Sequence, residues 1–240
     1  DRRAPRARRA RDRHDDDDDD AGKEPTTTTT RPSQAARTHR EAVRSAAATR
    51  DFAAIAFSQF CTGVQMGVHF GLMTVALTEE FGLSRREFAL ALVPAACVQI
   101  ANHLYLLPRL IRDGFADPFK TVLAIQATSA LFFAGVVAAA SLAPRSPWPF
   151  LLVQNVGFWC MSFNQGMANY TSARHAAFAA PDAKAALISL GRSTLNSGTA
   201  VGPTILIAVY RAADLRTAMA CVAVLWAIAA LLSRRASNGD

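Results

Sequence analysis

Long apolar stretches alternate with short polar connections along most of the chain, from residue 52 onward. A helix needs about 20 apolar residues to cross a bilayer, whereas a helix in a soluble core needs no uncharged run of that length. The pattern therefore predicts an all-α, polytopic membrane protein with a bundle of six transmembrane helices. The predicted spans cover residues 52–78, 85–110, 119–142, 148–170, 187–210 and 218–232, and the last has an alternative start near residue 214.

Local signals mark several ends of these spans. Gly82 follows the first span as a helix stop, and Ser84 forms a capping box with Glu87 at the start of the second. Pro94 lies inside the second span, where a membrane-spanning helix tolerates proline as a kink. Trp148 stands at the start of the fourth span, in the position of an interfacial aromatic residue. Polar connections are predicted at 109–120, 173–184 and 211–217.

Charge is concentrated before the first span. Residues 1–50 hold 13 of the 26 basic and 10 of the 19 acidic residues. Residues 1–32 are of low complexity and are predicted to be disordered. The segment 33–50 carries arginines at helical spacing, which predicts a short basic helix along the membrane surface. The predicted organisation is a cytosolic tail or central loop at 1–50, a transmembrane domain at 51–235 and a cytosolic tail at 236–240.

The net charge of +7 does not indicate nucleic-acid binding, because the basic residues lie in the tail and in short connections. Their distribution favours orientation by the positive-inside rule, with an even number of spans and both termini in the cytosol. The four cysteines lie one each in four apolar runs without CxxC spacing, which predicts buried free thiols rather than disulfides or a metal site. They are Cys61, Cys97, Cys160 and Cys221.

Polar side chains recur on one face of the first, second, fourth and fifth spans, whereas the third and sixth lack such a stripe. An unpaired polar side chain is costly in lipid, so a one-sided stripe indicates either hydrogen bonds between helices or a polar pathway. Repetition over four helices favours the pathway. The candidate substrate-pathway residues are Gln65, His69, Gln99, Asn155, Gln165, Asn196 and Arg192.

Two of these positions have alternative interpretations. His69, like His103 in the second span, is either a packing histidine with satisfied hydrogen bonds or a proton relay, since imidazole titrates near neutral pH. Arg192 lies two turns inside its helix and either extends to the cytosolic interface or faces a water-filled cavity. No Asp or Glu lies deep in any predicted span, so the usual intramembrane proton carrier is missing.

The fifth span is rich in small residues. Gly198 and Gly202 form a small-xxx-small pair that permits close helix approach, and Gly191 lies at a nearby helical position. Pro203 follows directly and allows the helix to bend, which suits a close-packed wall and also a gate. We predict packing or gating roles for Gly191, Gly198, Gly202 and Pro203.

Three stretches of sequence carry a resemblance to a known family. GRSTLNSGTAVGP (191–203) resembles the eleventh span of the drug:proton antiporter-like branch of the major facilitator superfamily. FGLSRREFALALVPA (81–95) resembles the loop between the seventh and eighth spans of that family, and RLIRDGFADP (109–118) is loosely similar to its charged eighth-to-ninth loop. The resemblance implies the C-terminal six-helix half of a twelve-helix fold, whose partner is a missing N-terminal half or a second copy.

The resemblance also implies a function. It is secondary active transport of a small organic solute by alternating access, with efflux as the expected direction and protons as a candidate coupling ion. On this interpretation the chain is a C-terminal half or fragment. The alternatives are a non-transporting membrane receptor or scaffold on the same helices, and a six-helix unit that works as a dimer. No enzyme, cofactor or metal is expected, because the spans contain no paired acid and base and no His/Asp cluster.

Overall fold

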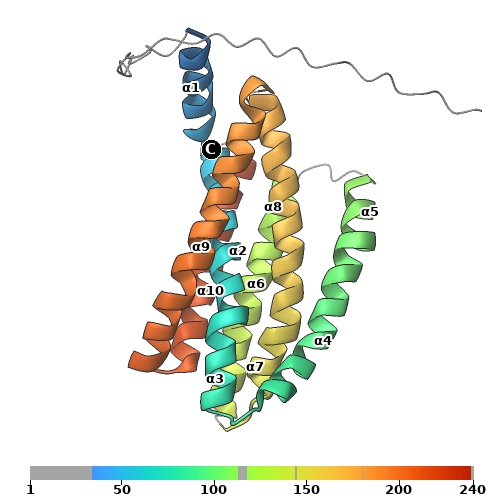
Figure 1. The fold of residues 1–240 in the computed structure, drawn as a ribbon, viewed down its shortest axis with the longest axis vertical. Coiled ribbons are helices and arrows are strands. Elements are labelled where there is room, and N and C mark those ends of the chain that lie inside the picture. Colours follow the sequence, from blue (N-terminus) through green and yellow to red (C-terminus); the bar gives the residue numbers. More distant parts are fainter. Residues whose placement is uncertain (1–33, 113–117, 144, 180, 239–240) are drawn as a thin grey trace, which may run out of the picture.

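Every regular element in the computed structural model is a helix within the described residues, which are 34–112, 118–143, 145–179 and 181–238 (Figure 1). A short helix, α1 (Gln34–Ala47), leads into long helical runs, three of which contain one π-helical turn. The runs are α2 (Arg50–Gly67), η1 (Val68–Leu72) and α3 (Met73–Glu79); α4 (Arg85–Ala101), η2 (Asn102–Leu106) and α5 (Leu107–Arg112); α6 (Pro118–Leu142); α7 (Trp148–Leu152), η3 (Val153–Gly157) and α8 (Phe158–Ala179); α9 (Lys184–Ala212), after the 3₁₀ turn η4 (Pro181–Ala183); and α10 (Leu215–Asn238).

Several of these helices have the length and composition of membrane spans. Among the described residues, four helices are long and apolar enough to cross a bilayer. The all-α class is therefore confirmed for this part of the chain, and the apolar helices are those of a membrane protein. The run 148–179 and α9 are also long, but their polar residues leave them outside the four. The four are Arg50–Glu79, Arg85–Arg109, Val122–Leu142 and Leu215–Arg235.

The basic segment before the first span is helical as predicted, although α1 ends at Ala47 rather than at residue 50. Thr49 then caps α2, because its hydroxyl accepts a hydrogen bond of 3.2 Å from the backbone N–H of Phe52. The tail predicted at 1–32 and the centre of the connection predicted at 109–120 lie outside the described residues.

Two predicted boundaries are wrong. The connection predicted at 173–184 is helical as far as Ala179, because its alanines continue the helix. Pro181 begins the separate 3₁₀ turn η4, which leads into α9. The last helix begins at Leu215, close to the alternative start, and extends beyond residue 232 to Asn238.

The signals predicted between the first two spans are present. Gly82 has a positive φ of 65°, a conformation that glycine adopts without steric penalty. Ser84 Oγ accepts from the Glu87 backbone N–H at 3.3 Å, and Glu87 Oε2 accepts from the Ser84 backbone N–H at 2.8 Å, which completes the capping box. Pro94 lies inside α4 and does not end it.

The helix α2 is the centre of the bundle. It contacts α8, α9 and α10, and its contact with α9 is as extensive as that between α6 and α10. Trp226, Phe133 and Leu72 are fully buried in the main hydrophobic core, which joins the first run to α6 and α10. The helix α4 lies at the edge, and only 11% of the apolar window in Arg85–Arg109 is buried. The polar residues of α2 are therefore held inside the bundle.

The turn between α9 and α10 is closed by Asp214, which precedes the first residue of α10. Its Oδ1 accepts hydrogen bonds of 2.7 Å from both the hydroxyl and the backbone N–H of Thr217, and its Oδ2 lies 3.1 Å from Arg216 Nε. The two bonds from Thr217 lower the pKa of Asp214, with a smaller contribution from Arg216. Because the pKa is lower in the folded state, the carboxylate stabilises the fold above the unfolded pKa of about 3.9 and loses this contribution as the pH falls through the folded pKa.

We expect Asp214→Ala to lower the free energy of unfolding by about 1 kcal/mol at neutral pH, the usual effect of losing a helix cap. The deficit should shrink once the pH falls below about 4, because the wild type then loses its charged cap as well. Thermal unfolding in detergent at neutral and acidic pH measures both effects. Asp214→Asn is the matched control, since Asn also caps helices. A deficit that is the same at both pH values would contradict this role.

Candidate functional site

Buried polar side chains from α2, α6 and the α7–α8 run meet inside the bundle, and we call them the polar seam. On α2 and η1, Ser58, Thr62, Gln65 and His69 recur at intervals of three or four residues and so share one helical face, with Gln59 next to Ser58. All of them except the half-buried Asn169 are buried. The polar seam consists of Ser58, Gln59, Thr62, Gln65, His69, Gln126, Gln154, Asn164 and Asn169.

One half of the seam joins α2 to both of its polar neighbours. Gln126 Nε2 on α6 donates to Ser58 Oγ at 2.9 Å, and Asn164 Nδ2 on α8 donates to Thr62 Oγ1 at 2.6 Å. Thr62 Oγ1 in turn donates to the Ser58 backbone oxygen at 2.9 Å. These bonds join α2, α6 and α8 through one continuous set of polar groups. The remaining two residues of this half bond to each other, since Gln59 Nε2 donates to Asn169 Oδ1 at 2.9 Å.

Several oxygens in the seam have no hydrogen-bond partner among the described residues. They are the amide oxygens of Gln59, Gln65, Gln126 and Asn164. A buried acceptor without a donor is unfavourable by about 1–3 kcal/mol, so each of these oxygens is a position at which a water or a solute donor would be stabilising. The seam is thus a polar interior whose acceptors are not saturated by the fold.

The other half of the seam is a reciprocal set of bonds between η3 and the junction of α2 with η1, which we call the carbonyl clasp. Gln65 Nε2 donates to the Gly157 backbone oxygen at 2.7 Å, and Gln154 Nε2 donates to the His69 backbone oxygen at 3.0 Å. The His69 ring lies between them, with Nδ1 3.2 Å from Gln154 Oε1 and Nε2 3.4 Å from Gln65 Nε2. Three of these bonds join the first run to η3, and the fourth, between Gln65 and His69, lies within the first run.

The carbonyl clasp assigns the tautomer of His69. Gln154 Oε1 can only accept, so the proton lies on His69 Nδ1. The other ring nitrogen then accepts from Gln65 Nε2, whose orientation is fixed by its bond to Gly157. Rotation of the Gln65 amide would place its oxygen against the Gly157 carbonyl. Both ring nitrogens are thus occupied in the neutral ring, which favours the packing interpretation of His69 over a free proton relay.

The π-helical turns explain why backbone carbonyls are available here. The Met73 N–H bonds to Val68 O, five residues back, and so bypasses His69 O, its partner in a regular α-helix. Gln154 takes the carbonyl that this leaves free. The turn η3 supplies both Gln154 and Gly157 to the same contact. Single π-helical turns occur frequently at functional sites, which makes the carbonyl clasp a candidate for movement or binding.

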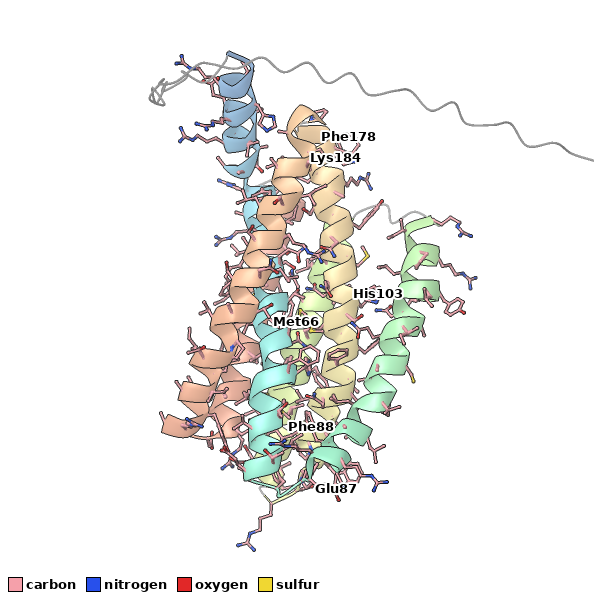
Figure 2. All side chains as sticks on the ribbon, viewed as in Figure 1. Met66, Glu87, Phe88, His103, Phe178 and Lys184 are labelled. Carbon is pink, nitrogen blue, oxygen red and sulfur yellow. The ribbon has the colours of Figure 1, made fainter. Side chains whose placement is uncertain are left out.

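The third π-helical turn, η2, holds a smaller polar contact with α8. Asn102 Nδ2 donates to Ser162 Oγ at 3.4 Å, and Ser162 Oγ lies 3.2 Å from His103 Nδ1. His103 also lies 3.0 Å from the Gln99 backbone oxygen. Figure 2 shows His103 between the α4–α5 run and α8. The turns η1 and η2 therefore contribute polar side chains to contacts with the α7–α8 run, and η3 contributes polar side chains from that run itself.

The structure brings only some of the predicted pathway residues together. Gln65 and His69 meet in the carbonyl clasp. Asn155 and Gln165 are half-buried on the α7–α8 run, and Asn155 Nδ2 donates to Leu151 O of its own helix. Gln99 is half-buried on α4 beside His103, away from the clasp. The remaining two residues, Arg192 and Asn196, are exposed on α9.

Sequence reasoning missed Gln154, Gln126 and Asn164. Gln154 was hidden because the π-helical turn η3 contains one extra residue, which shifts the inward face from 155 to 154. Gln126 is a buried polar residue of α6, a span for which no polar stripe is predicted, and its bond to Ser58 on α2 was not predicted. No periodic stripe of polar residues marks Gln126 in the sequence, so its bond to Ser58 carried no signal there.

The predicted glycines lie where α2 and α9 touch. A Cβ at Gly198 would overlap the Phe60 backbone oxygen, and one at Gly202 would lie 2.8 Å from Val64 Cα. On α2, a Cβ at Gly67 would lie 2.5 Å from Pro203 Cδ. The two backbones are thus in direct contact over two turns. The fourth predicted residue, Gly191, faces α8, where a Cβ would lie 3.3 Å from Ser172 Oγ.

The opposite face of α9 is polar and exposed. Ser193 and Ser197 each donate to the carbonyl four residues earlier in their own helix, at 3.0 and 2.9 Å. The exposed side chains of Arg192 and Asn196 have no hydrogen bond or ion pair with another described residue. The helix therefore carries a packed glycine face and a polar face without a partner.

The described residues contain no group of three or more His, Cys, Asp or Glu side chains that could hold a metal ion. The four cysteines are free thiols, with Cys61 and Cys160 buried and Cys221 half-buried. Cys97 is exposed, so the prediction of burial is wrong for it, because α4 lies at the edge of the bundle.

Comparison with protein-family models, with curated proteins and with solved structures finds no significant match for this chain. Any assignment of function therefore depends on the polar seam, the carbonyl clasp and the two faces of α9. The resemblance to the major facilitator superfamily is carried by the three stretches of sequence given above.

Proposed function

We propose that this chain is one six-helix unit of a secondary active transporter, which exports small organic solutes by alternating access. In this proposal the run 148–179 and α9 also cross the membrane, and both termini are cytosolic. The beginning of α2 and the end of α10 line one pocket, which supports an even number of crossings. The solute would pass between this unit and a second six-helix unit, either an N-terminal half or a second copy.

The two faces of α9 carry this proposal. The helix has 29 residues and is about 44 Å long, enough to cross a bilayer. One face is held against α2 by glycines, whereas the other exposes Arg192 and Asn196. A charged or amide side chain in the membrane interior normally faces water or protein rather than lipid. The polar face of α9 is therefore best explained as the wall of an aqueous pathway.

The polar seam gives the same unit a means of changing shape. Its hydrogen bonds join helices through neutral amides and hydroxyls, which can exchange partners with waters at little energetic difference. The unsatisfied oxygens of Gln65 and Asn164 would gain bonds in a second arrangement. We infer that Gln65, His69, Gln99, Asn155, Gln165 and Asn196 contact solute or pathway water, and that Arg192 contacts an anionic group or acts in gating.

Counter-flow in proteoliposomes tests transport directly. The purified protein should exchange a labelled solute from a panel of organic cations, anions and neutral compounds. Asn196→Ala should lower the initial exchange rate roughly tenfold, the effect of losing about one hydrogen bond to the solute. Thr128→Ala is the control, because Thr128 is exposed on α6 and its hydroxyl bonds to Ala124 O of its own helix. Absence of exchange for the entire panel, from well-folded protein, would contradict the proposal.

A non-transporting receptor or scaffold is the second candidate. It is favoured by one observation, the full burial of His69 and Gln154 within a closed set of bonds. Such a set also suits a static core. A receptor would bind a member of the panel with saturable affinity and show no counter-flow, so an equilibrium binding assay on the same proteoliposomes separates the two functions.

A further inference from the structure

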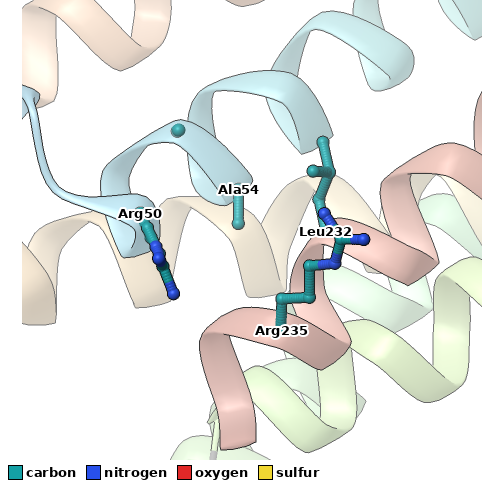
Figure 3. A pocket seen from close by; sticks show the side chains of 5 residues that line it. Arg50, Ala54, Leu232 and Arg235 are labelled. Carbon is teal, nitrogen blue, oxygen red and sulfur yellow. The ribbon is translucent and has the colours of Figure 1, made fainter. Parts of the chain in front are cut away.

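A pocket of about 530 Å³ lies between the first turns of α2 and the last turns of α10 (Figure 3). Its lining consists of Arg50, Ala53, Ala54, Leu232 and Arg235. Two candidate spans, Arg50–Glu79 and Leu215–Arg235, terminate at these two arginines. The pocket therefore lies where two apolar segments end, and in a bilayer such ends meet the polar headgroups.

The pocket combines two cations with an apolar floor. Figure 3 shows Arg50 on one side and Arg235 on the other, with Ala54 between them. None of the described residues that line the pocket is acidic. Both arginines are exposed, and neither forms an ion pair or hydrogen bond with another described residue. The two guanidinium groups are thus available to an anion that enters from the side of the bundle.

The neighbouring helix adds positive potential at the same end. The helix α1, which precedes α2 directly, exposes Arg37, Arg40 and Arg44, with Glu41 as the acidic residue among them. Surface potential of this kind attracts anionic lipid headgroups and falls off within about 10 Å. It increases the local concentration of anions without selecting one, so selectivity must come from the pocket.

The chemistry of the lining selects a phosphate attached to an apolar body. Guanidinium groups bind phosphate oxygens through two parallel N–H···O bonds, a geometry that a single Lys cannot offer. Ala53, Ala54 and Leu232 offer no polar atom from their side chains, so the floor suits methylene groups rather than a hydrated ion. A free phosphate would leave this floor uncovered. A phospholipid covers it with its glycerol and first acyl carbons.

We propose that this pocket binds the headgroup of an anionic phospholipid, with Arg50 and Arg235 as the two ligands of the phosphate. The described lining of the site comes from α2 and α10 and includes no residue of the polar seam, so the site requires neither the seam nor transport. It would anchor the beginning of the first run to the end of the last, nearer the helix ends than the bond from Cys61 Sγ to the Leu225 backbone oxygen, which joins α2 to α10 farther along both helices.

Native mass spectrometry of the purified full chain tests the site, with phosphatidylglycerol and phosphatidylcholine of the same acyl chains as probes. Phosphatidylglycerol should bind roughly tenfold more tightly. Its glycerol headgroup is neutral and leaves the negative charge of the phosphate free, whereas the cationic choline of phosphatidylcholine neutralises that charge. The double variant Arg50→Gln/Arg235→Gln should lose this preference. Arg234→Gln is the matched control, because Arg234 is exposed at the same end of α10 but does not line the pocket.

A second variant separates the pocket from its charge. Ala53→Phe keeps both arginines and fills the floor, so it should also abolish the preference for phosphatidylglycerol. Size-exclusion chromatography and thermal unfolding in detergent micelles verify that each variant is folded. Equal binding of the two lipids by the wild type would overturn the proposal, as would an Arg234→Gln effect as large as that of the double variant. Full displacement of the lipid by glycerol phosphate would assign the site to a free anion instead.

Discussion

Gly198→Ala should lower the free energy of unfolding of this chain by about 3 kcal/mol, at the upper end of the effects of overpacking. The added Cβ would overlap the Phe60 backbone oxygen and lie 3.0 Å from Val64 N. Both are backbone atoms of α2, so no side-chain rotation can relieve the contact. The two helices must separate along two turns, which also loosens the contact of Gly67 with Pro203. Thermal or denaturant unfolding in detergent, followed by circular dichroism, measures the loss.

The matched control is Gly135→Ala, which makes the same chemical change on α6. Gly135 is exposed, and a Cβ there would meet nothing within 4 Å. It should leave stability unchanged or raise it by up to about 1 kcal/mol, because alanine favours the helix. A Gly198→Ala protein as stable as the Gly135→Ala protein would show that α2 and α9 do not touch through their backbones.

The sequence of α9 predicts that this helix packs closely against a neighbour, but it does not predict that the neighbour is α2. The spacing of Gly198 and Gly202 predicts close approach of a neighbour, and the buried residues of α9 do recur every three or four positions. The helix that packs against α9 was not predictable. Gly63 and Gly67 have the same spacing in the first span, but the polar residues of that span predicted a pathway rather than a close helix contact. Composition indicates that a helix packs closely, whereas the choice of neighbour depends on the tertiary fold.

The sequence predicts that polar side chains lie inside the bundle, but it does not predict correctly which residues of the fourth span face inward. Gln65 and His69 lie at helical spacing, and they do share a face. Gln154 could not be predicted to face inward. The π-helical turn adds one residue, and a helical pattern of 3.6 residues per turn does not account for it. The hydrogen bond to Gly157 involves a backbone carbonyl, which carries no signature in sequence.

The helix α9 carries both of the residue types from which its roles are predicted, and they lie on different faces. Its polar residues were predicted to face a pathway, and its glycines to pack. In the structure these properties occupy opposite faces, with Gly198 buried and Asn196 exposed. A lipid-facing helix would need neither face, and a helix in the centre of a closed bundle would bury both. A helix between a core and an aqueous path requires both, and this is the position that the transport proposal gives to α9.

Gln154→Leu should lower the free energy of unfolding by about 2 kcal/mol, because it leaves two buried groups of His69 without partners. These groups are the backbone oxygen, now bonded to Gln154 Nε2, and the ring Nδ1–H. Thermal unfolding in detergent gives the loss. Gln165→Leu is the matched control on the same helical run, since Gln165 is half-buried and has no hydrogen bond to another described residue. It should change stability by less than about 0.5 kcal/mol.

The two variants together separate structure from transport. If Gln165 contacts the solute, Gln165→Leu should lower counter-flow roughly tenfold while the protein remains as stable as the wild type, because only a bond to the solute is lost. Gln154→Leu should lose stability first, and its remaining folded fraction should still bind solute. Equal stability of the two variants would contradict the role of the carbonyl clasp. Full counter-flow by Gln165→Leu would remove Gln165 from the pathway, and the exposed face of α9 would then be the part of the pathway still to be tested.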